Sequence, residues 1–243
     1  MKQSGLSTEV KTAIILGGGK ALRLRPLTNN KPKCMVPLCD KPLAEWQLDW
    51  LQRQGIRHVV FALGYRWEKV RSHFSTRGEN GLTIDYSVEE EPLGTGGALR
   101  KAMELTDDET CLALNGDVLT DLSIPDVVKQ HLRLRAMATL LVVPFVSPYG
   151  IVEVNSDGQV ACFVEKPCFS NSWINGGVYV LSHEILPLLP EKGNIEAMTF
   201  PSLAEKGQLA SFPYQGFWRA VDTLKDLGEL EKELAEKLAP PTS

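Results

Sequence analysis

The sequence predicts an α/β fold of three layers, in which helices cover both faces of a mostly parallel, mixed central sheet. Apolar strand patterns alternate with helical patterns over the first 145 residues, which is typical of βαβ units joined into a parallel sheet. After Pro148, two short alternating strands flank a turn, which predicts a small β-rich subdomain. The chain has 243 residues without an internal repeat or a long linker, so we expect one domain with this subdomain embedded in it.

Strands of the first half are expected where short apolar runs or strict alternation of apolar and polar residues occur. These segments are residues 12–16, 58–63, 82–88, 111–114 and 138–145. Helices are expected between them, where apolar residues recur at helical spacing. They are residues 65–74, 95–105 and 126–135, preceded by a helix that starts at Leu43, presents Leu43, Trp46 and Trp50 on one face and stops at Gly55.

The second half is expected to hold a hairpin, one further strand and a terminal helix. Strands at 151–154 and 159–164 flank Asn155-Ser-Asp-Gly158, whose composition is typical of a hairpin turn. Residues 177–181 form an apolar strand, and leucines recur at helical spacing after Thr223. We therefore expect an N-terminal extension (1–11) and one domain (12–243) that consists of residues 12–147, 148–222 and 223–243.

The composition excludes several classes of protein. With 26 Lys and Arg against 30 Asp and Glu, the net charge is −4, which argues against a general nucleic-acid binder. No apolar run approaches the roughly 20 residues of a membrane span, and the N-terminus lacks the apolar core of a signal peptide. Five cysteines without a Cys-x-x-Cys pair indicate free thiols in a reducing compartment. We expect a soluble, cytoplasmic protein.

A glycine-rich loop directly after the first strand is the most informative segment. Glycines at this position let backbone N–H groups approach a phosphate closely. A Walker loop is excluded because Ala21 stands where Ser or Thr is required, and a dinucleotide fingerprint because Leu22 stands where glycine is required. Five cations follow within 14 residues without one acidic residue, and they are Lys20, Arg23, Arg25, Lys31 and Lys33. A solvated basic loop is the alternative, but this position favours a polyphosphate ligand.

This segment resembles the signature of the sugar-1-phosphate nucleotidyltransferases, the pyrophosphorylases that make nucleotide sugars. The signature is Gly-Gly-x-Gly-Thr-Arg-x-x-Pro-x-Thr, followed by Pro-Lys-Pro. The matching residues are Gly18, Gly19, Arg23, Pro26, Thr28, Pro32 and Lys33. Ala21 and Leu22 depart from it, replacing a glycine and a threonine. The resemblance extends from about residue 12 to 230 and implies a Rossmann-like fold with a sugar-binding subdomain.

A second glycine-rich segment, Glu91-Pro-Leu-Gly-Thr-Gly-Gly-Ala98, lies between an expected strand and an expected helix. A tight strand-to-helix turn is the alternative interpretation. The segment is similar to the family's Pro-Leu-Gly-Thr-x-Gly-Ala element, which contacts the nucleobase. The resemblance implies that the nucleotide is bound by Leu16, Gly17, Gly18, Gly19, Glu91, Pro92, Gly94, Thr95, Gly96 and Asn115.

Two aspartates are candidates for a metal site. Asp117 ends the motif Asn115-Gly-Asp117 at the mouth of a buried strand, where a carboxylate can hold a hard cation such as Mg²⁺, although a turn or helix cap is the commoner use of such a motif. The resemblance implies that Asp117 and Asp222 bind Mg²⁺. Asp222 also stands where it can cap the terminal helix, and the two roles are compatible. The spacing of Asp121 from Asp117 is wrong for a glycosyltransferase Asp-x-Asp pair.

Three further motifs recur in the family in this order around the sugar phosphate. They are Tyr149-Gly150, Glu165-Lys-Pro167 and Asn175-Gly-Gly177. The resemblance implies a sugar-phosphate site formed by Gly116, Gly150, Glu165, Lys166, Asn175 and Gly176. Glu165 accepts hydrogen bonds from sugar hydroxyls there, and Lys166 neutralises the attacking phosphate. The implied catalytic residues are Arg23, Lys33 and Lys166.

The implied reaction converts an NTP and a sugar 1-phosphate into an NDP-sugar and pyrophosphate. Residues 89–97 resemble guanylyltransferases acting on mannose or heptose 1-phosphate, whereas residues 217–226 resemble glucose-1-phosphate cytidylyltransferases, so GTP is favoured over CTP, dTTP or UTP. A catalytically inactive nucleotide-sugar sensor and a glycosyltransferase of similar fold remain alternatives. Nucleic-acid and membrane partners are not expected. Many relatives are oligomers, which leaves a homo-oligomer open, and no hexapeptide repeat of a left-handed β-helix follows the domain.

Overall fold

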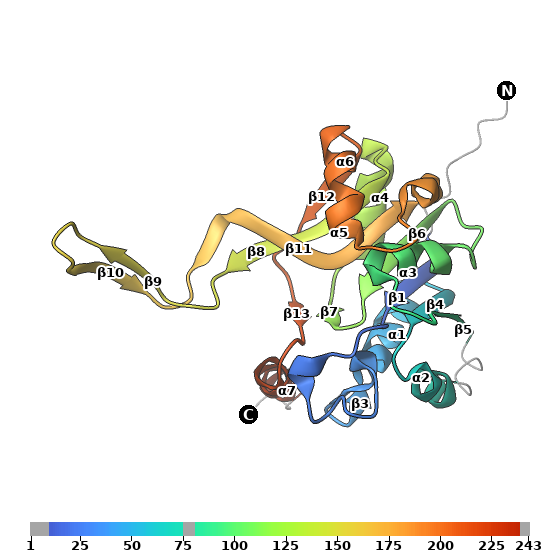
Figure 1. The fold of residues 1–243 in the computed structure, drawn as a ribbon, viewed down its shortest axis with the longest axis horizontal. Helices are drawn as coiled ribbons and strands as arrows, with labels where there is room; N and C mark the ends of the chain where they lie inside the picture. The colour runs from blue at the N-terminus through green and yellow to red at the C-terminus, as the bar shows by residue number, and fades with distance from the viewer. Residues whose placement is uncertain (1–9, 75–80, 239–243) are drawn as a thin grey trace.

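A seven-stranded mixed sheet forms the centre of the protein, of which the computed structural model describes residues 10–74 and 81–238 (Figure 1). Its strand order is β12-β8-β11-β6-β1-β4-β5. The strands are β1 (Thr12–Leu16), β4 (His58–Leu63), β5 (Thr83–Val88), β6 (Thr110–Asn115), β8 (Ala138–Val146), β11 (Cys168–Ser182) and β12 (Leu209–Pro213). All neighbours are parallel except β11, which runs antiparallel to both β8 and β6. The predicted mostly parallel, mixed sheet is confirmed.

Strand β1 lies between β4 and β6, and a core on each side of the sheet buries both of its faces. Ala13, Ile14 and Ile15 are completely buried. Alternate side chains enter two different cores, since Ala13 and Ile15 pack in one and Ile14 packs in the other. A continuous apolar run is what such a doubly covered parallel strand requires.

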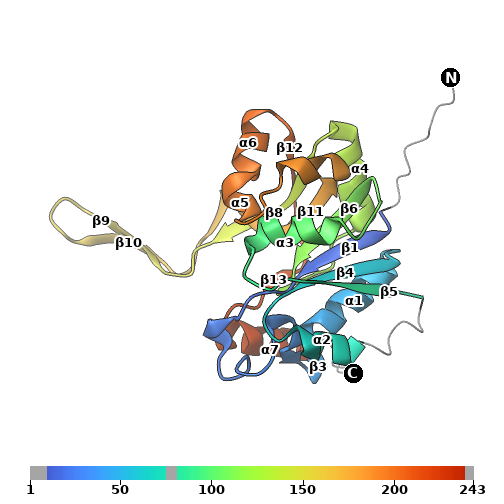
Figure 2. The same cartoon turned by 45° about the vertical axis from the view of Figure 1, so that its right-hand side comes forward.

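Helices cover both faces of the sheet, which gives the three expected layers (Figure 2). On one face, α1 (Leu43–Arg53), α2 (Trp67–Phe74) and α4 (Ile124–Leu134) contribute to the first core. On the other face, α3 (Gly94–Met103), α5 (Ile195–Met198) and α6 (Phe200–Glu205) contribute to the second. A third, smaller core joins the loop after β1 to the C-terminal helix α7 (Leu224–Leu238). No helix among residues 10–74 and 81–238 has the length and apolarity to span a bilayer.

Several short elements have no counterpart in the sequence prediction. They are the ribbon β2 (Pro37–Leu38) with β3 (Lys41–Pro42), the ribbon β7 (Val118–Thr120) with β13 (Trp218–Ala220), strand β12, helices α5 and α6, and the 3₁₀ segments Leu22–Leu24, Lys33–Met35 and His183–Leu188. These segments are too short for a periodic pattern to develop. The ribbon of β7 and β13 also pairs residues about a hundred positions apart, which no local pattern encodes.

A long two-stranded arm (residues 144–174) projects from the sheet as an extension of β8 and β11 (Figures 1 and 2). Its outer part is the predicted hairpin, formed by β9 (Ile151–Val154) and β10 (Val160–Val164), in which every residue is exposed. Strand β11 begins at Cys168, earlier than expected, and its pairing with β8 shifts register between Asn175 and Tyr179. The predicted β-rich subdomain is therefore this arm. The inner part of β11 and the strand β12 also belong to residues 148–222, and they pair in the central sheet.

Both ends of the predicted domain division extend beyond the described residues. Residues 1–9 of the predicted extension (1–11) lie outside them, as do residues 239–243 of the predicted terminal segment (223–243). Within the described range, α7 begins at Leu224, one residue after the predicted start of that segment.

His131 joins α4 to the sheet through a buried hydrogen-bonded imidazole. Its two ring nitrogens lie 2.9 Å from Thr139 Oγ1 and 3.0 Å from Ser182 Oγ. Ser182 Oγ itself donates to the carbonyl of Ala136, so it is free to accept from an imidazole N–H. Burial lowers the pKa of His131 from 6.5 to about 4, which keeps the ring neutral at pH 7.

We expect acid to destabilise the fold through His131. The unfolded chain takes up this proton near pH 6.5 and the folded chain only near pH 4, so stability is lost as the pH falls between these values. The loss between pH 7 and pH 5 should reach about 2 kcal/mol, and His131→Gln should remove it. Urea unfolding of both proteins at pH 7, 6 and 5 measures the difference. His73→Gln, which alters a partly exposed histidine, is the control and should keep the wild-type slope.

Candidate active site

A cavity of about 800 Å³ opens at the carboxyl ends of β1, β4, β5 and β6. This edge of a parallel sheet is where open α/β folds bind their ligands, and the volume suits a molecule of nucleotide size. Nine of the ten residues predicted to bind a nucleotide line it, and they are Leu16, Gly17, Gly18, Gly19, Glu91, Pro92, Gly94, Thr95 and Asn115. Gly116, Asp117 and Lys33 line it as well.

The glycine-rich loop forms one wall of the cavity. Gly17 N donates to the carbonyl of Ala62, and a Cβ on Gly17 would approach Leu63 to 3.0 Å. Gly19, by contrast, has open space where a Cβ would stand. Ala21 adopts a left-handed conformation (φ 45°), and Thr28 Oγ1 donates to its carbonyl at 2.9 Å. The loop thus keeps, with an alanine, a turn that glycine adopts more easily.

An ionic cluster at the edge of the cavity joins three distant segments of the chain. Lys33 Nζ donates to a carboxylate oxygen of Asp117 and, at 2.6 Å, to Asp222 Oδ1. Arg23 Nη2 lies 3.1 Å from the same Asp222 oxygen. Burial alone raises the pKa of Asp222, but the neighbouring ammonium of Lys33 and guanidinium of Arg23 outweigh it, so the pKa lies below its usual value. Arg23 and Asp222 therefore adjoin the cavity, although neither lines it.

The ribbon of β7 and β13 places the two aspartates side by side. Asp117 immediately precedes β7, and Asp222 follows β13 by two residues. The pairing continues to the site, because Val221 N donates to the carbonyl of Asp117 at 3.0 Å. The predicted cap of the terminal helix falls elsewhere, since Asp226 Oδ2 accepts from Thr223 N and Thr223 Oγ1 accepts from Asp226 N, as in a capping box. The side chain of Asp222 is thereby available to the site.

The donor set of this cluster suits Mg²⁺. Two carboxylates that reach the same ammonium nitrogen can also share a divalent cation. Mg²⁺ is commonly held by one or two carboxylates, with water and substrate phosphates completing its octahedron. Asp117 and Asp222 supply that number, and no group of three or more metal-ligating side chains exists in the described part of the chain.

A polar network supports the wall of the cavity at the start of α3. Sequence reasoning missed two of its members, Tyr179 and Glu196. Thr95 Oγ1 donates to Glu196 Oε2 at 2.5 Å and accepts from Ile195 N. Asn175 Nδ2 donates to Tyr179 Oη at 2.9 Å, and Tyr179 Oη in turn donates to Glu196 Oε1 at 3.3 Å. Burial raises the pKa of Tyr179, so its hydroxyl stays protonated. Asn175 on β11 is thus connected to Thr95 on α3.

Glu89 is another residue of the site that the sequence analysis did not single out. It follows β5, lines the cavity and fixes one carboxylate oxygen on Leu93 N at 2.9 Å. Its carboxylate occupies the space that a Cβ on Gly18 or Gly64 would need. Three consecutive glutamates, residues 89–91, were visible in the sequence, but nothing local indicated that the first lies inside the cavity.

The predicted sugar-phosphate residues are divided between two places. Gly176 adjoins the site, because its carbonyl accepts from Trp218 Nε1 and a Cβ on the next residue, Gly177, would meet Asn115 Nδ2 at 2.7 Å. Gly116 lines the cavity, and Asn175 is connected to it through Tyr179 and Glu196. The remaining three of the six, Gly150, Glu165 and Lys166, lie on the arm and do not line the cavity.

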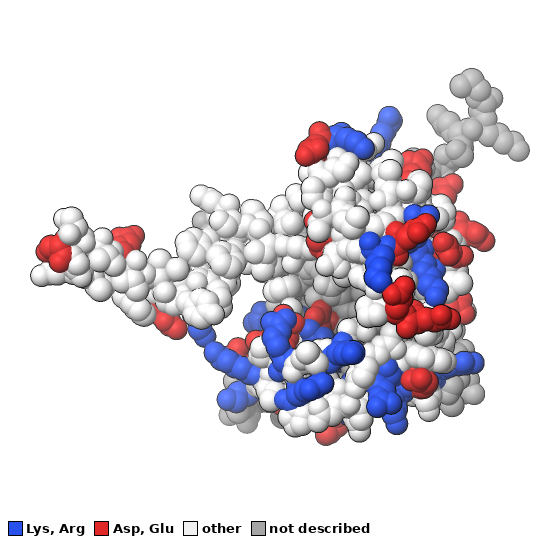
Figure 3. All heavy atoms as spheres, viewed as in Figure 1, with Lys and Arg blue, Asp and Glu red and all other residues white. Residues whose placement is uncertain are grey.

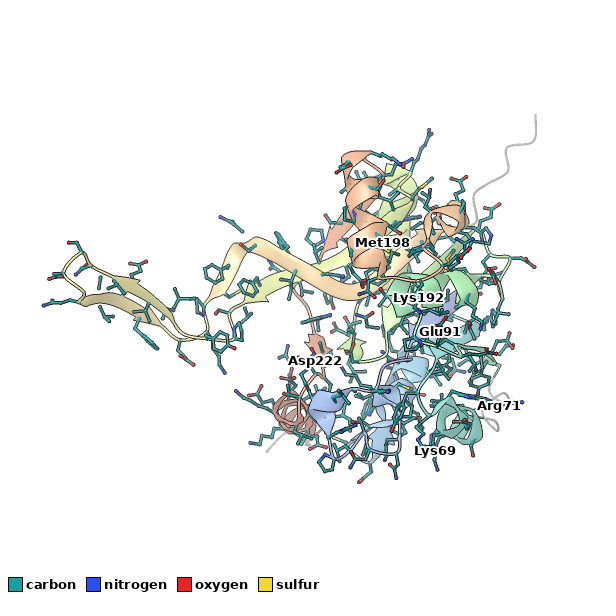
Figure 4. The ribbon with its side chains drawn as sticks, in the orientation of Figure 1. Lys69, Arg71, Glu91, Lys192, Met198 and Asp222 are labelled. Atoms are coloured by element: carbon teal, nitrogen blue, oxygen red, sulfur yellow. The ribbon has the colours of Figure 1, made fainter. Side chains whose placement is uncertain are left out.

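Gly96 packs closely against Pro190 and Gly193 in the structure. Its N–H donates to the carbonyl of Gly193 at 2.9 Å, so this donor is already used. A Cβ at this position would meet Pro190 at 2.7 Å. Gly96 therefore brings α3 against residues 190–193, which precede Asn194 on the cavity wall. Glu91 and Lys192 form an ion pair across the same junction at 2.7 Å (Figure 4).

Comparisons with known proteins agree on one family. The family model described as nucleotidyl transferase matches residues 12–237. The mannose-1-phosphate guanylyltransferase catalytic subunit beta of Danio rerio is 38% identical over 88% of this chain and 62% of its own length. The mannose-1-phosphate guanyltransferase of Yarrowia lipolytica is 36% identical over 93% of this chain and 67% of its own. This chain thus spans about two thirds of these relatives.

Among solved structures, HddC from Yersinia pseudotuberculosis in complex with GMP-PN has the same fold. The TM-score is 0.75 at 24% identity, and the alignment covers 93% of this chain and 100% of that one.

We expect Gly96→Ala to destabilise the protein by about 1–3 kcal/mol, because the added methyl group overlaps Pro190 and the carbonyl of Gly193. Gly228→Ala is the matched control, since α7 leaves open space there and alanine stabilises a helix by up to about 1 kcal/mol over glycine. Urea unfolding measures both. Equal stabilities of Gly96→Ala and wild type would contradict the packing role.

Proposed function

The chain belongs to the nucleotidyl transferase family, and on this premise we propose that it transfers a guanylyl group from GTP to a mannose- or heptose-type sugar 1-phosphate. The products are a GDP-sugar and pyrophosphate. Residues 12–147 serve as the nucleotide-binding half and residues 148–222 as the sugar-phosphate half. The observation that carries this proposal is the cluster of Lys33, Asp117 and Asp222 at the edge of a cavity walled by the glycine-rich loop.

The cavity offers a separate place for each part of the nucleotide. The polyphosphate lies along residues 17–20, where Gly19 is open and Lys20 supplies positive charge. The base and ribose lie against Gly94 and Thr95 at the start of α3. The α-phosphate then points toward Lys33 and Asp117, where the reaction takes place.

The reaction is an in-line displacement at the α-phosphorus. A phosphate oxygen of the sugar 1-phosphate forms a bond to that phosphorus, while the bond to the bridging oxygen of the leaving pyrophosphate breaks. No general base is required, because the attacking phosphate is already ionised at pH 7. Catalysis therefore depends on positioning and charge stabilisation. Arg23 binds the β- and γ-phosphates, Lys33 stabilises the charge that develops at the α-phosphate, and Lys166 orients the nucleophile.

Asp117 and Asp222 would hold Mg²⁺ in this scheme. The ion supplies positive charge beside the α-phosphate, which both negatively charged reactants must approach. The position of the Lys33 ammonium, which donates to both carboxylates, supports a cation at this place. When substrate is bound, the ammonium of Lys33 is shared between the two aspartates and the substrate phosphate.

Glu89 supports guanine as the base. Guanine presents two adjacent donors on its Watson–Crick edge, the N1–H and the 2-amino group, and an ionised carboxylate is a pure acceptor that can receive both. Adenine and cytosine each present a ring acceptor beside their amino group, and uracil and thymine present a single donor between two carbonyls. The mannose- and heptose-type sugars are proposed from the names of the relatives, which act on mannose 1-phosphate, and from the sequence resemblance at residues 89–97.

The proposed activity predicts pyrophosphate release that depends on Mg²⁺, GTP and a sugar 1-phosphate together. A grid of ATP, GTP, CTP, UTP and dTTP against mannose, glucose and heptose 1-phosphates measures it, with EDTA as the metal-free control. We expect the highest kcat/KM with GTP and mannose or heptose 1-phosphate. Binding of GDP-mannose without pyrophosphate release from any pair would instead identify a regulatory nucleotide-sugar sensor.

We expect Glu89→Gln to lower kcat/KM for GTP by about 10- to 150-fold, the equivalent of losing a charged hydrogen bond worth about 1.5–3 kcal/mol. Activity with UTP should fall much less, because an amide can pair with adjacent donor and acceptor groups. The same pyrophosphate assay provides the measurement. Glu90→Gln, an exposed neighbour that also lines the cavity, is the matched control and should retain the GTP preference. An unchanged GTP preference in Glu89→Gln would refute this role.

A further inference from the structure

The arm presents more apolar surface than a free two-stranded ribbon can keep in water. Seventeen large apolar side chains are exposed among the described residues, and eleven of them lie on the arm. They are Val146, Tyr149, Ile151, Val152, Val154, Val160, Phe163, Val164, Phe169, Trp173 and Ile174. Only four charged residues accompany them, so the arm is mostly uncharged in Figure 3. A surface of this kind marks an interface, and isolated hairpins are marginally stable.

Lys166 stands at the end of the outer hairpin in an unusual conformation. It follows β10 by two residues and has a left-handed backbone (φ 45°), which is rare for a residue other than glycine. Its side chain is exposed, and no hydrogen bond or ion pair joins it to another residue of the described ranges. Conformations of this kind cluster at functional sites. The arm therefore displays a cation that has no hydrogen-bond or ion-pair partner among the described residues.

The cavity lacks a cation for a second anionic ligand. The charged residues that line it are two lysines and four acidic residues, and they are Lys20, Lys33, Glu89, Glu90, Glu91 and Asp117. Lys33 is already shared between two carboxylates. Arg23, which adjoins the cavity, is assigned to the β- and γ-phosphates, so an anionic nucleophile would gain from a further cation supplied from outside the cavity.

The surroundings of the cavity also carry exposed apolar side chains. Leu22 follows the lining residue Ala21 and is 60% exposed, and Leu224 stands two residues after Asp222. Met198 on α5 is 57% exposed and packs beside Gly193, the neighbour of the lining residue Asn194 (Figure 4). These residues place exposed apolar side chains beside the cavity, which suits contact with the apolar arm that carries Lys166.

We propose that the arm of one copy of this chain covers the open side of the cavity of a second copy and delivers Lys166 to it. The role of Lys166 at the sugar phosphate rests on the proposed function. A second copy is the occupant because this chain carries both partners of the proposed contact, which are the apolar arm with its exposed Lys166 and a cavity lined by only two lysines. Reciprocal exchange in a symmetric dimer satisfies both arms and both cavities at once.

Subunit complementation tests this arrangement. Lys166→Ala inactivates the arm and Asp117→Asn inactivates the body, so each homomeric variant should retain less than a hundredth of wild-type activity. Co-expression with two affinity tags allows the mixed dimer to be isolated. In that dimer the body with Asp117 receives the arm with Lys166, so one of two sites is intact and about half of wild-type pyrophosphate release should return. A mixed dimer as inactive as both parents would overturn delivery between subunits.

The mass in solution tests the interface independently of activity. Light scattering should give at least twice the chain mass of 26.9 kDa for wild type. The variant Val154→Ser/Val160→Ser changes a cross-strand pair on the arm and should be monomeric with an unchanged melting temperature. Leu105→Ser/Leu134→Ser removes similarly exposed leucines elsewhere and should stay dimeric. An active wild-type monomer would refute the arm exchange but not the proposed function. If wild type is dimeric, the arm variant is monomeric and wild type releases no pyrophosphate, only the proposed function is refuted.

Discussion

The ammonium group of Lys33 between two carboxylates is the interaction on which the rest of the site depends. Asp117 and Asp222 would repel each other at this distance without a cation between them. The chain separates Lys33 from Asp117 by 84 positions and from Asp222 by 189, so the cluster joins the start, the middle and the end of the fold. The two short strands β7 and β13 hold the aspartates in register, and the small third core holds the loop of Arg23 against α7. In the proposed reaction, this preformed arrangement of charges would need little rearrangement on phosphate binding.

The walls of the cavity form one packing unit. The Glu89 carboxylate, which is proposed to select the base, packs directly against Gly18 of the glycine-rich loop. The carboxylate and the loop therefore limit each other's position. On the opposite side, Thr95 is held by Glu196, and Glu196 is held by Tyr179 of the central sheet. The proposed selection of the base and the proposed binding of the phosphates would consequently depend on the same packed residues.

Sequence reasoning predicted the longer strands and helices of the first 145 residues well, because their apolar residues recur with the period of a strand or a helix. Thr12–Leu16 and His58–Leu63 were predicted to the residue. The residues around Asp117 also came from a motif that follows a strand directly. Glu89, Asn194 and Glu196 were missed because their place in the site arises from contacts between distant segments. The hairpin of the arm was predicted, but its exposure was not, because a local alternating pattern does not tell whether another part of the fold covers the strands, and every residue of β9 and β10 is exposed.

The register shift in β11 has a consequence for how such a protein can diverge. The strand changes its pairing between Asn175 and Tyr179, where Gly177 is left-handed and lies against Asn115 of the cavity wall. The direction in which the arm leaves the sheet is therefore set by residues that also shape the site. Substitutions in this segment would alter both the direction of the arm and the shape of the cavity wall. The turn at residues 155–158 contributes to neither, so it is free to lengthen or change in composition. Variation between lineages should accordingly collect at the tip of the arm and be scarce at its root.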